Sequence, residues 1–359
     1  MNTLRLVVDP TRLHSEESQA TIDRAAQILR RGGLVALPTE TVYGLGANAL
    51  DSAAVARIFQ AKQRPSWDPI IVHIAGPVLH NSMLEPLVTD LPFLAQKLMQ
   101  AFWPGPLTLL LPRSKAVPDI VTAGRPLVGI RMPAHSVVFA VIRRAGIPVA
   151  APSANVFGHI SPTTAAHVLE DLDGKIEAVV DAGPARHGVE STVLDPNQSP
   201  MIIYRPGAIT AQQIREVAGP VELFKESAPR ESAPESLPSP GVGLRHYAPR
   251  ARLMLVEGAL TDLPGRLAIA AQQNSQARLG LMLPAELAGI AAQTPFQNAL
   301  VFSWGRWSAP NELAERLYAG LRALDGEDCE VILCPVPGDA GIGEAIRDRL
   351  RKAAATAPR

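Results

Sequence analysis

A stretch of hydroxyl side chains and glycines carries the clearest chemical signal in this chain of 359 residues. Residues 38–46 read Pro-Thr-Glu-Thr-Val-Tyr-Gly-Leu-Gly and follow the apolar run 34–37, which is typical of a buried strand. Thr39, Thr41 and Tyr43 could hold a small polar ligand at the end of that strand without adding charge. Glycine lets a ligand approach the backbone closely. Taken alone, the stretch could equally be an ordinary turn.

Basic residues at three places could hold an anion. Lys62 and Arg64 stand two apart between a helical pattern and Pro65, and in an extended segment their side chains would point to the same side. Arg131 ends a strand pattern, where a guanidinium can grip a carboxylate with two hydrogen bonds. Arg205 precedes a Pro-Gly turn. The alternatives are a solvated surface pair for the first two, a surface ion pair for Arg131 and a turn-stabilising role for Arg205.

Other polar side chains follow strand patterns in the same way. Ser153 and Asn155 come after a strand pattern that ends at Pro152, and their spacing lets them converge on one phosphate or ribose. Both residue types also form ordinary turns. His73 lies among apolar residues, where a histidine is usually a hydrogen-bonded core residue, and Ser191 could either donate to a ligand or cap a turn.

In their order and spacing, these motifs resemble the YrdC-domain family of L-threonylcarbamoyladenylate synthases, in its long two-domain form. The resemblance covers about residues 15–222. It rests on residues 38–46, 62–65, 103–108, 129–133, 151–155, 161–163, 190–193 and 205–207. Residues 239–241 and 246–249 are similar to the linker of the two-domain members, and the remainder is similar to their C-terminal domain.

The resemblance implies a reaction that joins L-threonine, bicarbonate and ATP into threonylcarbamoyl-AMP and releases pyrophosphate, for threonylcarbamoyladenosine modification of tRNA. Because the reactants are anionic, such a site must supply fixed positive charge and oriented donors. Lys62 and Arg64 would be the catalytic residues. The residues implied for ATP are Lys62, Arg64, Ser66, Thr122, Ser153, Asn155, Ser161, Arg205, His246 and Tyr247. Those implied for L-threonine are Thr39, Thr41, Tyr43, His73, Arg131 and Ser191.

Cofactor and partners follow from the same resemblance. Mg²⁺ is expected with ATP, since this ion relies on substrate oxygens and water, and the sequence names no protein ligand for it. The product would pass to a tRNA threonylcarbamoyl-transferase. Direct RNA contact is also considered, and the alternative function is a double-stranded RNA-binding module of the same fold without synthase activity. The balance of 34 basic and 34 acidic residues argues against nonspecific nucleic-acid binding.

Alternating helix and strand patterns predict an α/β fold. With the resemblance, residues 1–222 are expected to form a YrdC-like twisted open sheet with a concave ligand cavity, and residues 251–359 a smaller, Rossmann-like α/β domain. The expected helices are 15–31, 53–61, 92–100, 137–144, 163–169 and 342–354. The expected strands are 34–37, 70–74, 107–111, 128–130, 149–150, 178–181, 192–194, 202–204, 253–256, 279–283, 299–302 and 331–334.

The segment 223–250 is predicted to be a linker or lid. Residues 224–240 are rich in Glu, Ser and Pro and too poor in apolar side chains to order themselves. The glycines that follow permit hinge motion, and Arg245, His246 and Tyr247 could touch a nucleotide and exclude water from it. The alternative is a surface loop that joins the two domains.

Three further features limit the class of protein. Cys329 and Cys334 are too few for a disulfide framework or a zinc site, so they are expected to be reduced core thiols. Gly338, Gly341 and Gly343 precede a helical pattern but do not match a dinucleotide-binding fingerprint, which favours a tight turn. No stretch approaches the ~20 apolar residues of a membrane span, and a soluble, cytoplasmic protein is expected.

Overall fold

The computed structural model describes residues 2–225, 237, 239, 242 and 247–355. The chain divides into two compact units, each made of separate stretches of sequence. The first unit contains Met1–Phe157, Pro162–Arg186 and Glu190–Val242. The second contains Gly158–Ser161, His187–Val189 and Gly243–Arg359. The second unit therefore takes two short loops from the region that the sequence assigned to the first domain.

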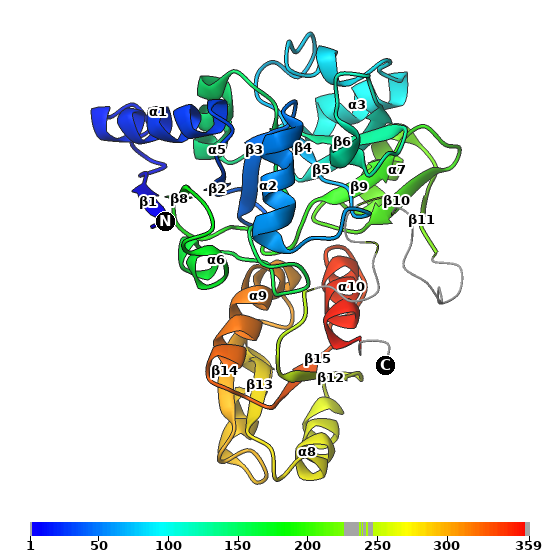
Figure 1. Ribbon diagram of the computed structural model, residues 1–359. Helices are drawn as coiled ribbons and strands as arrows, with labels where there is room; N and C mark the ends of the chain where they lie inside the picture. Colours follow the sequence, from blue (N-terminus) through cyan, green and yellow to red (C-terminus); the bar gives the residue numbers. More distant parts are fainter. Residues whose placement is uncertain (1, 226–236, 238, 240–241, 243–246, 356–359) are drawn as a thin grey trace. The chain divides into compact units, whose positions relative to one another are not determined.

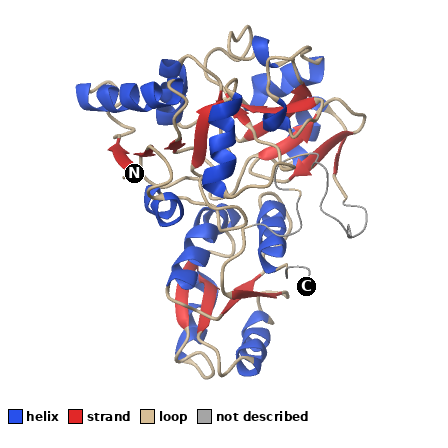
Figure 2. Ribbon diagram, in the orientation of Figure 1, coloured by secondary structure: helices blue, strands red, loops and turns tan. Residues whose placement is uncertain are grey.

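The first unit is an α/β structure, as predicted (Figure 2). Its helices are α1 (Glu16–Arg30), α2 (Ser52–Lys62), η1 (Glu85–Leu87), α3 (Phe93–Phe102), α4 (Asp119–Thr122), α5 (Ser136–Ala145), α6 (Ala165–Leu172) and α7 (Ala211–Ala218). Its strands are β1 (Leu4–Val7), β2 (Val35–Leu37), β3 (Gly44–Asn48), β4 (Val72–His73), β5 (Leu107–Pro112), β6 (Leu127–Arg131), β7 (Val149–Ala150), β8 (Ala178–Asp181), β9 (Thr192–Asp195), β10 (Met201–Arg205) and β11 (Val221–Leu223).

The strands form one mixed sheet in the order β1-β8-β2-β3-β7-β4-β6-β5-β9-β10-β11 (Figure 1). Strand β4 pairs in parallel with β6, and His73 lies opposite Arg131 in that register. Because these residues end their strands, both reach the same edge of the sheet. Strand β2 pairs with β3 in an antiparallel sense, so residues 38–43 form the connection between two paired strands.

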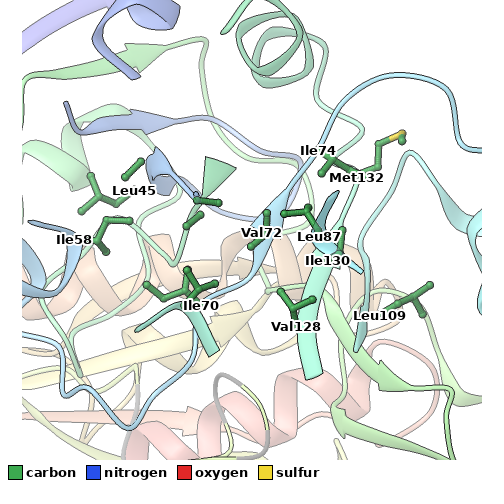
Figure 3. Packing of buried hydrophobic residues seen from close by; sticks show 14 of the residues in the cluster. Leu45, Ile58, Ile70, Val72, Ile74, Leu87, Leu109, Val128, Ile130 and Met132 are labelled. Carbon is green, nitrogen blue, oxygen red and sulfur yellow. The ribbon is translucent and has the colours of Figure 1, made fainter. Parts of the chain in front are cut away.

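Apolar side chains cover both faces of this sheet. Along β2, Ala36 packs in a core with α2, α3, α6 and α7, whereas Val35 and Leu37 pack in a second core with α1 and α5. This split follows the alternation of side chains along a strand. Figure 3 shows part of the first core, with Ile58 of α2 among side chains from β3 to β6. The sheet is thus held rigidly from both sides, and the ends of its strands can position polar groups.

The second unit has a wholly parallel sheet in the order β12-β15-β13-β14. Its strands are β12 (Arg252–Val256), β13 (Leu279–Pro284), β14 (Leu300–Gly305) and β15 (Val331–Pro335). Its helices are α8 (Leu263–Gln273), η2 (Ala285–Ala292), α9 (Pro310–Gly326) and α10 (Gly343–Ala354). The layered α/β architecture was predicted. The strand order differs from the 3-2-1-4 order of nucleotide-binding Rossmann sheets.

The two borrowed loops pack tightly within the second unit. Gly188 has a φ of +66°, and a Cβ atom there would lie 2.2 Å from the carbonyl oxygen of Ala314 in α9. Arg322 Nη2 of the same helix donates to the carbonyl oxygen of Ile160 over 2.5 Å. Helix α9 therefore fixes the backbone of both loops.

The remaining sequence features of the second unit have simple structural roles. Cys329 and Cys334 are buried free thiols. Gly343 approaches Gly338 so closely that a Cβ atom would meet its carbonyl oxygen at 2.1 Å, as expected for a tight turn. Among the residues that the structure describes, no helix is both long and apolar enough to cross a membrane.

Candidate functional site

Lys62 is the last residue of α2 and is almost completely buried. Gln63 caps this helix in a left-handed conformation, so the extended segment predicted for Lys62 and Arg64 is wrong. The Lys62 ammonium donates to the carbonyl oxygens of Ser153 and Asn155, each over 2.5 Å. The backbone N–H of Phe157 also binds the Lys62 carbonyl oxygen. The Lys62 side chain therefore joins the predicted motifs 62–65 and 151–155. It does so from the end of a helix and not from an extended segment.

Arg64 is buried beside a carboxylate that the sequence analysis missed. Its Nη2 lies 2.9 Å from Asp68 Oδ2, and Nε and Nη2 donate to the carbonyl oxygens of Asp68 and Pro69. Burial raises the pKa of Asp68 even though Arg64 and Lys62 oppose this shift. Burial and the Arg64 charge hold the pKa of Lys62 well below its ordinary value. Two basic residues and one acidic residue thus share a dry environment.

Arg131 lies at the end of β6, among residues of the hydroxyl-rich stretch. Its Nε donates to the Gly105 carbonyl oxygen over 3.2 Å, and its Nη1 donates to Thr41 Oγ1 over 3.0 Å. Thr39 Oγ1 donates to the Val42 carbonyl oxygen and lies 2.8 Å from Thr41 Oγ1. Since that leaves Thr39 no further proton, Thr41 donates to Thr39. The hydroxyls are oriented in a chain that starts at Arg131.

Glu40 provides the countercharge for Arg131. The Glu40 Oε1 and Arg131 Nη2 atoms are 2.6 Å apart, with side chains only 7% and 4% exposed. The two side chains therefore form a buried ion pair. Burial would raise the pKa of Glu40, but Arg131 and the backbone N–H groups of Glu40 and Ala134 outweigh burial and lower it. Glu40 is therefore an ionised carboxylate within the predicted ligand-binding stretch.

His73 is neutral in this setting. Burial, followed by the Arg131 charge, lowers the pKa of His73 to about 3, although Glu40 acts in the opposite direction. Its Nδ1 atom is buried without a hydrogen-bond partner. A neutral imidazole can offer either a donor or an acceptor, depending on its tautomer.

Ser191 and Arg205 are also brought together. Arg205 donates from Nε to the Ser191 carbonyl oxygen and from Nη2 to Ser191 Oγ, each over 3.0 Å. Ser191 Oγ lies 2.8 Å from Thr108 Oγ1 of β5, a residue that sequence analysis placed in a motif but not in the site. The Arg205 charge lowers the pKa values of both Asp68 and His73. Arg205 is thus close enough to act electrostatically on both groups of charges.

Several predicted residues lie apart from these contacts. The Tyr43 hydroxyl donates to the Gly183 carbonyl oxygen over 2.7 Å. Thr122, in α4, accepts from Arg113 over 3.0 Å, and Ser66 is exposed in a turn.

The remaining residues predicted to bind ATP belong to the second unit. Ser161 is buried in the second unit. Tyr247 is buried there too, stacked on Tyr318 with ring centres 5.6 Å apart, and the Arg349 guanidinium lies 5.4 Å from the Tyr247 ring. His246 lies outside the described residues.

The residues missed by sequence analysis are acidic or lie in strands. Glu40 stands between Thr39 and Thr41, which were predicted for the site, but it was not predicted itself. Asp68 follows the Lys62–Arg64 motif at a spacing of four from Arg64, which is a possible ion-pair signal. Among the described residues, no group of three or more His, Cys, Asp or Glu side chains could hold a metal ion.

Two family profiles match the chain. One, described as "Telomere recombination", matches residues 27–207. The other, described as "Threonylcarbamoyl-AMP synthase, C-terminal domain", matches residues 209–355.

Curated relatives and solved structures match nearly the whole chain. A threonylcarbamoyl-AMP synthase of Bacillus subtilis is 44% identical over 358 residues, which cover 99% of this chain and 98% of the relative. One of Pyrococcus abyssi is 41% identical over 92% of both chains. The crystal structure of P. abyssi Sua5 complexed with L-threonine has a TM-score of 0.86 and 39% identity, and covers 98% of each chain.

Proposed function

Since this chain belongs to the threonylcarbamoyl-AMP synthase family, we propose that it converts L-threonine, bicarbonate and ATP into threonylcarbamoyl-AMP, pyrophosphate and water. The family expected from the motifs is thereby confirmed. Identity to named synthases over both units carries this proposal. The structure of a relative with L-threonine bound supports the amino acid as a substrate.

The charges of the first unit suit the proposed chemistry. The threonine nitrogen, as the free amine, bonds to the bicarbonate carbon with loss of water and gives a carbamate. One carbamate oxygen then attacks the α-phosphorus of ATP while pyrophosphate leaves. The carbamate and the triphosphate repel each other, so their approach needs fixed positive charge in a water-poor site. Lys62, Arg64 and Arg205 are buried basic residues in the same unit. We assign the triphosphate to the first two and the adenylate phosphate to the third.

Further site assignments follow the local contacts. Ser153 and Asn155 are tied to Lys62 through their carbonyl oxygens, so their loop lies beside the proposed phosphate position. Thr41, His73 and Arg131 are assigned to threonine, because Arg131 donates to Thr41 Oγ1 and is the register partner of His73.

We also propose a cofactor, a downstream partner and a cellular compartment for this reaction. The described residues offer no cage for a metal, so we propose that Mg²⁺ arrives with ATP, held by phosphate oxygens and water. The product would then be passed to a tRNA threonylcarbamoyl-transferase, in the cytoplasm where tRNA is modified.

The direct test is pyrophosphate release from the purified full chain. We expect release to require L-threonine, bicarbonate and ATP together, and threonylcarbamoyl-AMP to appear in equal amount by mass spectrometry. Omission of each substrate in turn is the control. Pyrophosphate release that continues without threonine or bicarbonate would contradict the proposed activity.

A further inference from the structure

An open groove lies in the first unit, beside the N-terminal half of α1 and along one side of α5. Its volume is about 740 Å³, which is within the range of sites that hold small organic ligands. None of the residues that line it is among those assigned above to L-threonine or to ATP. The groove is therefore separate from the proposed active site.

Helix α5 lines the groove with a face that it does not bury. Its buried side chains pack in the core that α1 also enters (Figure 1). Four of its groove residues follow the spacing i, i+3, i+4 and i+7, which places them on one side of a helix: Ser136, Phe139, Ala140 and Arg143. Polar side chains thus stand at both ends of this stripe, and apolar ones stand in its middle.

The remaining lining of the groove is also largely apolar. Ile22 of α1 is only 1% exposed, and Leu13 and Phe139 are partly buried against the same core. Pro104 and Pro133 add to this apolar surface. An apolar body seated in the groove would cover the parts of these side chains that water still reaches, which is favourable.

The charge of the groove is positive and only partly compensated. The Arg144 side chain pairs with Asp23 of α1. Arg143 is exposed and, within the described part of the chain, has no hydrogen bond, ion pair or ring contact. The side chains of His14 and Ser136 have no such partner there either. Among the described residues that line the groove there is no Asp or Glu, so one guanidinium is left to face an anion.

We propose that this groove binds a small organic acid, with its apolar body between α1 and α5 and its carboxylate or sulfonate on Arg143. A guanidinium binds such planar or tetrahedral oxyanions through charge-assisted hydrogen bonds. A neutral apolar molecule would leave Arg143 unused, and an inorganic anion would leave the apolar lining in water. The ligand is a monoanion, because the groove offers one uncompensated guanidinium. The site is additional to the proposed synthase activity.

The test uses two fluorescent probes, anilinonaphthalene sulfonate and N-phenylnaphthylamine, which share their aromatic rings but differ in the sulfonate. Their Kd values are measured by fluorescence titration on the full-length wild type and on Arg143→Gln. We expect the substitution to weaken binding of the sulfonate about 10-fold, as for one lost charge-assisted hydrogen bond. Binding of the neutral probe should stay unchanged. A general loss of structure would weaken both probes alike.

Two further variants locate the bound probe. Arg24→Gln is the matched control, since Arg24 is an exposed arginine of α1 that does not line the groove, and it should leave both Kd values unchanged. Ala140→Phe fills the middle of the groove and should remove binding of both probes. Arg143 lies on the surface, so its substitution keeps the test decisive even if the phenylalanine variant does not fold.

The outcome does not depend on the proposed function. Excess ATP should not displace the sulfonate, and Arg143→Gln should retain wild-type pyrophosphate release. Displacement by ATP would place the probe in the nucleotide site and overturn the proposal. Equal effects of Arg143→Gln and Arg24→Gln, undiminished binding to a folded Ala140→Phe, or no binding of the sulfonate to the wild type would overturn it as well.

Discussion

Two groups of buried charges in the first unit are organised in opposite ways. Around Lys62, the two basic side chains bind neutral backbone carbonyl oxygens, and Arg64 also pairs with Asp68. At Arg131, a guanidinium faces the ionised carboxylate of Glu40. The first group brings two basic side chains together, which suits a polyanion. The second is neutral overall, which suits a zwitterion. The two groups both contain buried basic side chains, so it is the presence of the Glu40 countercharge that distinguishes the proposed threonine site from the proposed phosphate site.

The largest expected effect is loss of stability in Arg131→Ala. Removing this side chain leaves the Glu40 carboxylate buried without a countercharge, which typically costs about 3–5 kcal/mol of unfolding free energy. Urea unfolding measures the loss. Arg5→Ala is the control, because Arg5 lies 2.6 Å from Asp181 but has a side chain that is 59% exposed. An exposed pair contributes only about 0–1 kcal/mol. Equal losses in the two variants would contradict the view that burial makes the Glu40 pair special.

Removal of the Lys62 ammonium should affect catalysis more than stability. We expect Lys62→Ala to lose about 2–4 kcal/mol of transition-state stabilisation, or about 30- to 1,000-fold in kcat/KM for ATP. The Kd of threonine should stay unchanged, because Lys62 contacts none of the residues assigned to threonine. Lys175→Ala is the control, since Lys175 also binds a backbone carbonyl oxygen, that of Asp171, but lies exposed. Near wild-type turnover would remove Lys62 from the phosphate site.

His73 should make the stability of the protein depend on pH. Its pKa of about 3 in the folded state lies below the ordinary 6.5, so between these values the unfolded chain binds the extra proton. Stability therefore falls as pH falls, by about 2 kcal/mol between pH 7 and pH 5 from this residue. Unfolding of wild type and His73→Asn at both pH values measures the difference. The same pH dependence in both proteins would show that His73 is not buried in the neutral form.

The smallest expected effect is that of Tyr43→Phe. The sequence placed Tyr43 in the threonine site, but its hydroxyl donates to the Gly183 carbonyl oxygen. Loss of that bond should cost about 1 kcal/mol of unfolding free energy and leave the Kd of threonine unchanged. A clear loss of threonine affinity with unchanged stability would instead return Tyr43 to the site.

Strand and helix patterns were enough to predict most of the sheet. The apolar runs at β2, β5 and β8 became strands because both faces of the sheet are covered. Strand β3 was missed, since Gly44–Asn48 has a glycine-rich sequence typical of a turn. It forms a strand because β2 and β7 supply backbone partners on its two sides, which is tertiary information.

The site was predictable as a set of motifs but not as a set of contacts. The sequence named Lys62, Ser153 and Asn155, yet the lysine meets the backbone of that loop, where residue type carries no signal. Glu40 was not predicted, because its partner Arg131 lies 91 positions away and no local pattern links the two. The pairing of Glu40 with Arg131 depends on how the sheet places the end of β6 beside the connection between β2 and β3, which the sequence does not show.

The composition of the second unit has a practical consequence for dissecting the protein into pieces. A polypeptide ending at residue 222 would keep Gly158–Ser161 and His187–Val189 but lose the α9 atoms against which Gly188 and Ile160 pack. A polypeptide starting at residue 251 would have α9 without those loops. The change in composition near residue 223 is therefore a boundary in the sequence that does not coincide with the division into compact units. Separately expressed halves would each expose surface that α9 and the two loops bury together in the intact chain.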